Sequence, residues 1–517
     1  MANLQTTIVS GALTVTGSAS LRATSVSGAL TVTGSSDGLL KFSNSKDAII
    51  IGAGLLLTGL SNVGSSTVNI GSNAGYLTTG ALRSNFLGYE AGREATNAQY
   101  SNFFGYQAGY LSKNATHSNF LGYQAGYLVS GATAYYNNFL GFRAGYLATN
   151  ASFSNFLGVS AGQQATGVTE SNFLGSYAGQ SATNAQHSNF LGYAAGLSAT
   201  NAQHSNFLGY LAGYQVSGAT ANNNNFLGQS AGSAATNVQY GNFLGNNAGN
   251  SATNASHSNF LGYTAGSSAT NATYSNFLGY GAGNSATNAQ YSNFLGLNAG
   301  REATNAQYSN FLGLNAGREA TNATHSNFLG YQAGYLVSGA TANNNNFFGQ
   351  SAGQSATNAQ YSNFLGYQAG FQVSGATAIN NNFFGQSAGQ SATNASNSNF
   401  IGYRAGYNLT GTENNIAIGT DAGYKSTAYS ATNCIFVGAT CVSAATGPLS
   451  NAIGIGNSLS LTTSNTVVIG NSSQNIGIGG LVNPSYKLDV SGGGRFTSSV
   501  YVNADELSSV LQNQMFS

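Results

Sequence analysis

The chain repeats one short unit, and the length of this unit constrains the fold more than any other feature of the sequence. The glycine of "NFLG" marks the unit at Gly88, Gly105 and Gly122. From Gly71 to Gly419 it recurs in 20 steps, of which 16 are 17 residues long and 4 are 19 residues long. The longer steps all contain "VSGATA", so the two additional residues always enter at one corner. Such a period indicates a repeat architecture rather than separate domains.

A 17-residue unit is too short for a pair of helices, which needs about 33 residues or more. Its Gly, Asn, Ser, aromatic and β-branched residues also disfavour helix. The unit suits one coil of a parallel β-solenoid (β-roll), with "SNFLGY" as one strand and "SATNAQ" as a second. The recurrent "AG", as in Ala91-Gly92, marks the corner, where glycine adopts a positive φ. The expected fold class is therefore all-β.

The regular rhythm gives the domain organisation. We expect the solenoid to cover residues 51–480, with regular coils over 71–419 and irregular coils over 420–480. Residues 1–50 repeat "VSGALTVTGS" and are expected to form a β shaft, an attachment segment or a cap. The ends of a solenoid expose unpaired strand edges and need covering.

The C-terminal segment, residues 481–517, is expected to form a trimerisation or cap segment. Within it, "NADELSSVLQNQM" predicts a short amphipathic helix over residues 504–514. Asn503 is the expected N-cap, and Asp505 and Glu506 stand in the first turn.

Each "NFLG" strand is apolar on both faces, because successive side chains point in opposite directions and both Phe and Leu are apolar. A strand of this kind is expected to be buried on both sides. A thin coil has only one interior, so the other face needs a partner, and identical chains around a symmetry axis are the simplest one. The expected core residues are Phe86, Leu87, Phe120, Leu121, Phe190, Leu191, Phe260, Leu261, Phe328 and Leu329.

Two polar or aromatic columns accompany the core. The asparagine of "ATNA" is expected to form a hydrogen-bonded ladder along the stack, which includes Asn97, Asn184, Asn201, Asn254 and Asn288. A broken column of tyrosines follows the marker glycine, at Tyr89, Tyr106, Tyr123, Tyr193 and Tyr210. These rings either pack from coil to coil on a half-buried face or contact sugars at the surface.

Composition excludes several function classes. Charged residues make up 5% of the chain, against about 25% in an ordinary domain. The net charge of +1 offers no basic surface for nucleic acid. The start, "MANLQTTIVSG", lacks a signal-peptide pattern, and no apolar run reaches the roughly 18 residues of a membrane span. We therefore expect neither nucleic-acid binding nor membrane insertion.

The sequence also offers no catalytic set. All five histidines precede "SNF", in a slot that other coils fill with Tyr or Phe, and this exchange argues against metal binding. The two cysteines, Cys434 and Cys441, are expected to be small buried side chains. We expect no enzyme activity, no cofactor and no metal.

Two sequence resemblances bear on function. "NNIAIGTDAG" (414–423) and "NAIGIGNS" (451–458) resemble the heads of trimeric autotransporter adhesins, which are trimeric left-handed parallel β-rolls. Residues 483–502 look like the segment that precedes the chaperone of phage and viral tail fibres, and residues 10–34 are similar to their shaft repeats. Together the resemblances imply a homotrimeric fibre, assembled in the host cytoplasm and carried on a virion surface.

The leading functional hypothesis is a viral or phage fibre that attaches to a host surface by multivalent display. Its expected partners are its own copies, other virion or fibre proteins at one end, and a host glycan or protein. A bacterial surface adhesin or an extracellular structural filament of the same fold is the main alternative. An ice-binding solenoid is a third hypothesis, since one threonine recurs in each coil, at Thr96, Thr183, Thr200, Thr253 and Thr287.

Overall fold

The structure is a computed structural model that describes residues 66–131, 134–219, 221–340, 342–376 and 378–474, together with the backbone of strands outside these ranges. The chain divides into two compact units, residues 1–264 and 265–517. The expected domain boundaries, after residues 50 and 480, stay a prediction. The expected helix over 504–514 lies outside the described residues.

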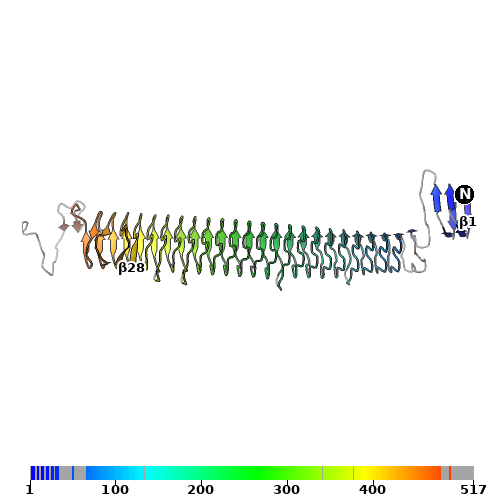
Figure 1. Cartoon of the computed structure of the whole chain (residues 1–517), viewed down its shortest axis with the longest axis horizontal. Coiled ribbons are helices and arrows are strands. Elements are labelled where there is room, and N and C mark those ends of the chain that lie inside the picture. The colour runs from blue at the N-terminus through cyan, green and yellow to red at the C-terminus, as the bar shows by residue number, and fades with distance from the viewer. Residues whose placement is uncertain are drawn as a thin grey trace, which may run out of the picture. The chain divides into compact units, whose positions relative to one another are not determined.

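The fold is an all-β parallel solenoid of about 23 coils with about 17 residues per turn. Each regular coil contributes one three-residue strand, and in each unit the strands follow one another as a row of parallel arrows (Figure 1). In unit 1 the strands of this row are β7 (Ile49–Ile51), β8 (Val68–Ile70), β9 (Asn85–Leu87), β10 (Asn102–Phe104), β11 (Asn119–Leu121), β12 (Asn138–Leu140), β13 (Asn155–Leu157), β14 (Asn172–Leu174), β15 (Asn189–Leu191), β16 (Asn206–Leu208), β17 (Asn225–Leu227), β18 (Asn242–Leu244) and β19 (Asn259–Leu261).

Unit 2 continues the same pattern of strands. Its regular coils contribute β20 (Asn276–Leu278), β21 (Asn293–Leu295), β22 (Asn310–Leu312), β23 (Asn327–Leu329), β24 (Asn346–Phe348), β25 (Asn363–Leu365), β26 (Asn382–Phe384) and β27 (Asn399–Ile401). Its less regular coils contribute β28 (Leu409–Glu413), β29 (Ile416–Ile418), β30 (Tyr429–Thr432), β31 (Ile435–Val437), β32 (Val442–Ser443), β33 (Leu449–Ser450), β34 (Ile453–Ile455), β35 (Ser460–Leu461), β36 (Val467–Ile469), β37 (Ile476–Ile478) and β38 (Leu488–Val490).

The N-terminal repeat also forms strands that pair at an offset of one unit. The strands are β1 (Ala2–Gln5), β2 (Ile8–Ser10), β3 (Leu13–Thr16), β4 (Ala19–Arg22), β5 (Ser25–Ser27) and β6 (Leu30–Thr33). The pairs β1–β4, β2–β5 and β3–β6 are all parallel. In the N-terminal repeat, too, strands that lie 17 residues apart in the sequence pair with each other.

Register in the solenoid is strict, because equivalent residues of successive coils lie opposite each other. Phe190 of β15 pairs with Phe173 on one side and with Phe207 on the other. The expected second strand is reduced to single β-bridges in the regular coils, as between Thr166 and Thr183. The next residue, Asn184, has a φ of 50°, which ends the extended run after one residue. The prediction of a full second strand is therefore wrong for these coils.

The interior of each coil holds one phenylalanine and several alanines. Phe190, Ala195, Ala199 and Ala202 are fully buried. The Phe190 ring stacks on those of Phe173 and Phe207, with ring centroids 4.7 Å apart in both directions. The fully buried set includes the predicted Phe86, Phe120, Phe190, Phe260 and Phe328. One large ring for every three small side chains fits a coil with a narrow cross-section.

The leucines of the same strands require a correction. Leu87, Leu121, Leu191 and Leu261 are half-buried, and Leu329 is 37% exposed. Alternation along the strand places Phe and Leu on opposite faces, as expected, but the phenylalanine lies inside the single chain and the leucine lies outside. Of the two apolar residues of each strand, therefore, only the phenylalanine belongs to the core of the single chain, and the leucine lies on the outer face.

The glycine that follows each strand allows the coils to stack this closely. Gly192 has a φ of 135°, and a Cβ placed there would lie 2.4 Å from the carbonyl oxygen of Gly209 in the next coil. Any larger residue would therefore separate the coils as well as strain the backbone.

No helix in the part of the chain that the structure describes is long and apolar enough to cross a bilayer.

Candidate functional site

The outward strand face is the most regular surface of the molecule. In every strand from β9 to β27 the two outward residues are an asparagine and an apolar residue, which is Leu, Phe or Ile. Asn172 donates to Asn189, and Asn189 donates to Asn206, each over 2.8 Å between Nδ2 and Oδ1. Beside this amide column runs the apolar column, in which Leu208 and Leu227 are each 36% exposed. The face is flat, uncharged and half apolar.

The strand asparagines and the serines before them were not among the predicted ladder residues. Ser188 is fully buried; its hydroxyl donates to the carbonyl of Ala202 and accepts from the backbone N–H of Ser205. Part of the signal was present in "SNFL", because a period of two places Ser188 on the same face as Phe190 and Asn189 on the same face as Leu191. The two columns satisfy polar groups that stacking would otherwise bury unpaired.

The predicted "ATNA" ladder is confirmed where its bonds are described. Asn97 donates to Asn114 over 2.8 Å, and Asn184 donates to Asn201 over 3.1 Å. Asn288 accepts from Asn271 and donates to Asn305, both over 2.9 Å. Asn254 has the same turn geometry, with a φ of 52°. Asparagine suits this position for two reasons: it tolerates a left-handed backbone, and its side chain carries both a hydrogen-bond donor and an acceptor.

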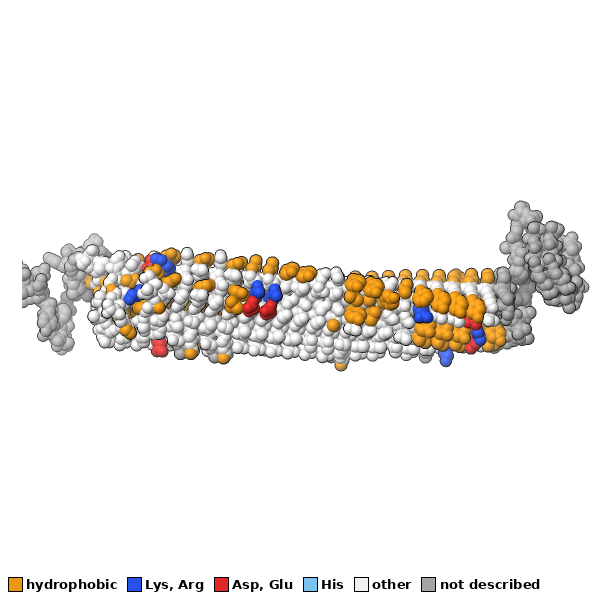
Figure 2. Space-filling model, viewed as in Figure 1, with side chains coloured by type: hydrophobic (Ala, Val, Ile, Leu, Met, Phe, Trp, Pro, Cys, Tyr) orange, Lys and Arg blue, Asp and Glu red, His pale blue; other side chains and the backbone are white. Residues whose placement is uncertain are grey.

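The predicted tyrosine column forms one of two aromatic ladders on the early coils. Tyr89, Tyr106 and Tyr123 stack with ring centroids 5.1 and 5.0 Å apart, and Phe142 extends the ladder. A second ladder joins Tyr110, Tyr127 and Tyr146 at 5.0 and 5.1 Å. Two orange columns on one face of Figure 2 show apolar and aromatic side chains gathered here. Further along unit 1, Tyr193 and Tyr210 stack at 5.3 Å.

A line of polar side chains joins the coils of these ladders. Gln107 donates to Glu90 over 2.8 Å, Gln124 donates to Gln107 over 2.9 Å, and the Nε of Arg143 donates to Gln124 over 3.0 Å. The Arg143 guanidinium lies 5.3 Å from the Phe142 ring and 5.4 Å from the Tyr146 ring. The surface is therefore tied together by internal hydrogen bonds and cation–π contacts.

Acid–base properties of this surface follow from its packing. Partial desolvation in the stack raises the pKa of Tyr106, and the neighbouring Tyr123 and Tyr89 hydroxyls raise it further. Desolvation likewise raises the pKa of Tyr127. A hydrogen bond to Glu90 raises the pKa of the Arg93 guanidinium. The phenols therefore stay neutral at physiological pH, and the arginine stays charged.

The ladder geometry bears on the expected contact with sugars. A sugar packs on an aromatic side chain by covering the face of the ring. Inside a ladder both faces of a ring are covered by its neighbours, and centroids about 5 Å apart leave no space for a sugar ring between them. Tyr106 and Tyr123 thus present ring edges and hydroxyls to solvent, which favours the packing interpretation for these two, whereas Tyr89, Tyr193 and Tyr210 each stack on one ring of the column.

The histidine slot is an aromatic column as well. His117 stacks between Tyr100 and Tyr136, at 4.8 and 4.7 Å, and His187 stacks on His204 at 4.8 Å. Within the described ranges, no three His, Cys, Asp or Glu side chains lie close enough together to hold a metal ion. The threonine of each coil makes the β-bridge to the next coil, as in Thr183 with Thr200. These slots therefore hold coil-to-coil contacts.

The fold and these surfaces define a parallel β-solenoid repeat protein whose outward columns are ladders of identical side chains. A comparison with known protein families finds none that matches the chain. A comparison with curated proteins likewise finds no match.

Proposed function

We propose that the chain is the structural subunit of a homotrimeric fibre on a viral or phage particle, and that the fibre attaches to a host surface. The observation that carries this proposal is the leucine column of the outward strand face. One apolar side chain per coil, about a third exposed, repeats over many coils without an intervening charge. A continuous apolar stripe of this kind marks an association surface.

A second copy of the chain is the partner that fits this stripe best. The apolar residues recur at the spacing of the coils, so a parallel, in-register copy presents a leucine wherever the first chain presents one. The strand asparagines already bond to each other along the stack and leave few polar groups for a different partner to satisfy. Closed symmetry buries the stripe of every subunit, and three chains around one axis agree with the resemblance to trimeric fibres.

Repetition also supports a role in attachment. Surface ladders such as Tyr89–Tyr106–Tyr123 display one chemical group many times along the stack. Weak contacts repeated on a rigid support gain strength through effective concentration, so attachment does not depend on one deep pocket. One end of the fibre would contact virion proteins.

The mass of the purified chain in solution tests the association. Light scattering should give a mass near three times the 52.5 kDa of the chain, with a band that resists detergent until it is heated. A mass of one chain would overturn the proposal. Immunogold labelling of particles from the source tests the location: label on projecting fibres supports it, and particles free of the chain contradict it.

A further inference from the structure

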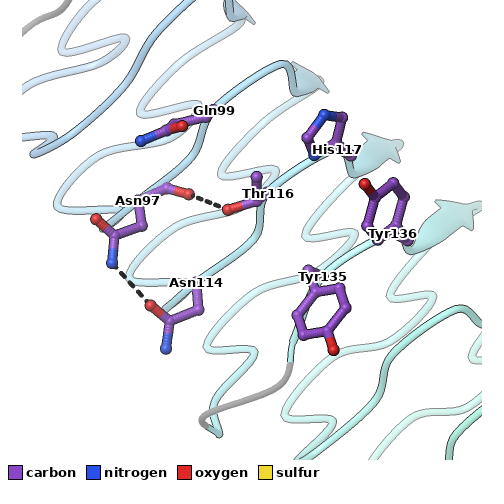
Figure 3. A pocket seen from close by; sticks show the side chains of 7 residues that line it. All are labelled: Asn97, Gln99, Asn114, Thr116, His117, Tyr135 and Tyr136. Carbon is purple, nitrogen blue, oxygen red and sulfur yellow. Dashed lines mark hydrogen bonds between the residues drawn. The ribbon is translucent and has the colours of Figure 1, made fainter.

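A shallow cavity lies on the outer surface of the coils around the first two-residue insertion of the repeat. The insertion precedes β12, and the cavity of about 410 Å³ lies beside it, over the two preceding coils. Figure 3 shows Asn97 and Asn114 on one side of the cavity and Tyr135, Tyr136 and His117 on the other. The cavity is wide and open to solvent, so it would hold a ligand at the surface of the coils instead of enclosing it.

Some polar groups of the cavity are already bonded, and these fix its floor. Asn97 donates to Asn114, which donates to the carbonyl of Gly131 over 3.2 Å. The Thr116 hydroxyl donates to the carbonyl of Asn97 over 2.8 Å. Three polar side chains are thereby held in place without a ligand. This preorganisation lowers the entropic cost of binding.

Other polar groups at the cavity have no protein partner among the described residues. They are the Gln99 carboxamide, the His117 imidazole and the Tyr135 hydroxyl, and all three border the same space. A carboxamide and a hydroxyl each both donate and accept hydrogen bonds, as does a neutral imidazole with its two nitrogens. The lining carries no carboxylate, lysine or arginine. An uncharged ligand rich in hydroxyl groups matches this set.

Tyr135 differs from the ladder aromatics in its orientation. Its ring stands at 75° to Tyr136 and at 79° to Phe153, whereas Tyr136 is stacked between His117 and Phe153. No parallel ring covers Tyr135 within the part of the chain that the structure describes. Tyr136 and Phe153 therefore contact Tyr135 at steep angles instead of stacking on it, and Tyr135 borders the cavity.

We propose that this cavity binds a neutral saccharide, with a pyranose ring against Tyr135 and its hydroxyl groups hydrogen-bonded to His117 and Gln99. An aromatic ring packs against the C–H side of a sugar while amides and hydroxyls bond its rim. The inference rests on the proposed attachment function and gives it a ligand class and a site.

The chain contains a matched control for the site. The third insertion, before β24, has the same residues at five of the seven lining positions: Asn305, Gln307, Asn322, Thr324 and His325 stand for Asn97, Gln99, Asn114, Thr116 and His117. The two tyrosines are replaced by Asn343 and Asn344. There the amides bond to each other, since both Asn344 and Gln360 donate to Asn343 over 2.9 Å. The third insertion thus has no aromatic ring to offer a sugar.

Saturation-transfer difference NMR on the full-length chain tests the proposal with defined probes: the methyl pyranosides of glucose, galactose and mannose, and N-acetylglucosamine. The wild type should transfer saturation to the C–H protons of at least one probe. Tyr135→Asn with Tyr136→Asn, which reproduces the natural sequence of the third insertion, should abolish the transfer. Adding Asn343→Tyr and Asn344→Tyr to that variant should restore it.

The proposal is overturned if no probe receives saturation from the wild type, or if the signal is unchanged in the asparagine variant. Light scattering of the same variants separates this outcome from failure of the fibre proposal. The variants should keep the mass of the wild type, because neither tyrosine lies on the leucine face. A wild type that binds sugar as a single chain would support the site and contradict the trimer.

Discussion

Gly196 lies so close to the ring of Phe190 that a Cβ at residue 196 would be 2.3 Å from the ring. Its φ of 63° is also one that glycine adopts most readily. The same relationship recurs at the "AG" corner of the other regular coils, as between Gly213 and Phe207. The corner glycine therefore has two roles: it turns the chain, and it leaves the space that the phenylalanine fills.

A double-mutant cycle should separate these roles. Phe190→Ala should destabilise the coil by about 3–5 kcal/mol, because it removes a fully buried ring. Gly196→Ala should cost about 1–2 kcal/mol for the backbone alone, and more in the wild type because of the ring. In the Phe190→Ala background the ring contact is absent, so only the backbone cost should remain. Hydrogen exchange of the amides of coils 175–209 measures the local free energy of opening.

Gly447→Ala is the control for that cycle, because no atom lies within 4 Å of the position of its Cβ. It should change stability by less than about 0.5 kcal/mol. Equal costs of Gly196→Ala in the two backgrounds would contradict the packing role of the glycine.

The leucine face gives a prediction about assembly. Leu208→Asp with Leu227→Asp places two carboxylates on the outward apolar column, where a partner chain would have to desolvate them. We expect a mass of one chain by light scattering, with the coil structure kept in the circular dichroism spectrum. Ser251→Asp with Ser268→Asp adds the same two charges at exposed turn positions and should leave the mass unchanged. If the double variant keeps the wild-type mass, the leucine face is not the interface.

The strand asparagine column gives a prediction about stability. Asn189→Ala removes the bond that Asn189 donates to Asn206 and the one that it accepts from Asn172. Each bond contributes about 0.5–1.5 kcal/mol, so a loss of about 1–3 kcal/mol is expected. Local hydrogen exchange around β15 measures it. Gln186→Ala in the same coil should cost less than about 0.5 kcal/mol, and equal losses at the two positions would count against the ladder.

The two cysteines give a prediction about pH. Both are free and fully buried, and burial raises the pKa of each thiol above the ordinary value of 9.0. Because the folded pKa of each thiol lies above the unfolded one, burying the neutral thiols destabilises the fold only at high pH. The stability is present in full below pH 9 and is lost as the pH rises through the folded pKa. Labelling by a thiol reagent at pH 7.5 should therefore be slow in the folded chain and fast after denaturation. Fast labelling of both thiols in the folded chain would contradict their burial.

Much of the solenoid could be predicted because a short period leaves few folds open. The spacing of the marker glycines predicts the coil, and the strict register, with Phe173, Phe190 and Phe207 opposite one another, follows from it. The amide ladder at Asn97 and Asn184 was also predictable, because identical side chains stack when identical coils stack. The buried Ser188 and the strand Asn189 were within reach of the same alternation.

The saccharide site lay beyond sequence reasoning. "YYNN" at the first insertion reads like "NNNN" at the third, and nothing in the letters says that Tyr135 stands at 75° to Tyr136. The tyrosine column at Tyr89 was easier to recognise as a candidate contact, yet both ring faces of Tyr106 and Tyr123 in it are closed by stacking. Ring orientation depends on side-chain packing around the inserted residues, which a repeat pattern does not encode.

The sequence by itself determined the period, the strand, the corners and the columns, because each follows from local geometry and from repetition. Only the tertiary structure decided which side of the strand lies inside. Alternation places Phe190 and Leu191 on opposite faces but does not say which face the coil encloses. The answer depends on space: Gly196 and the alanines of the other sides leave room for one large ring, so Phe190 fills the interior and Leu191 is turned outward.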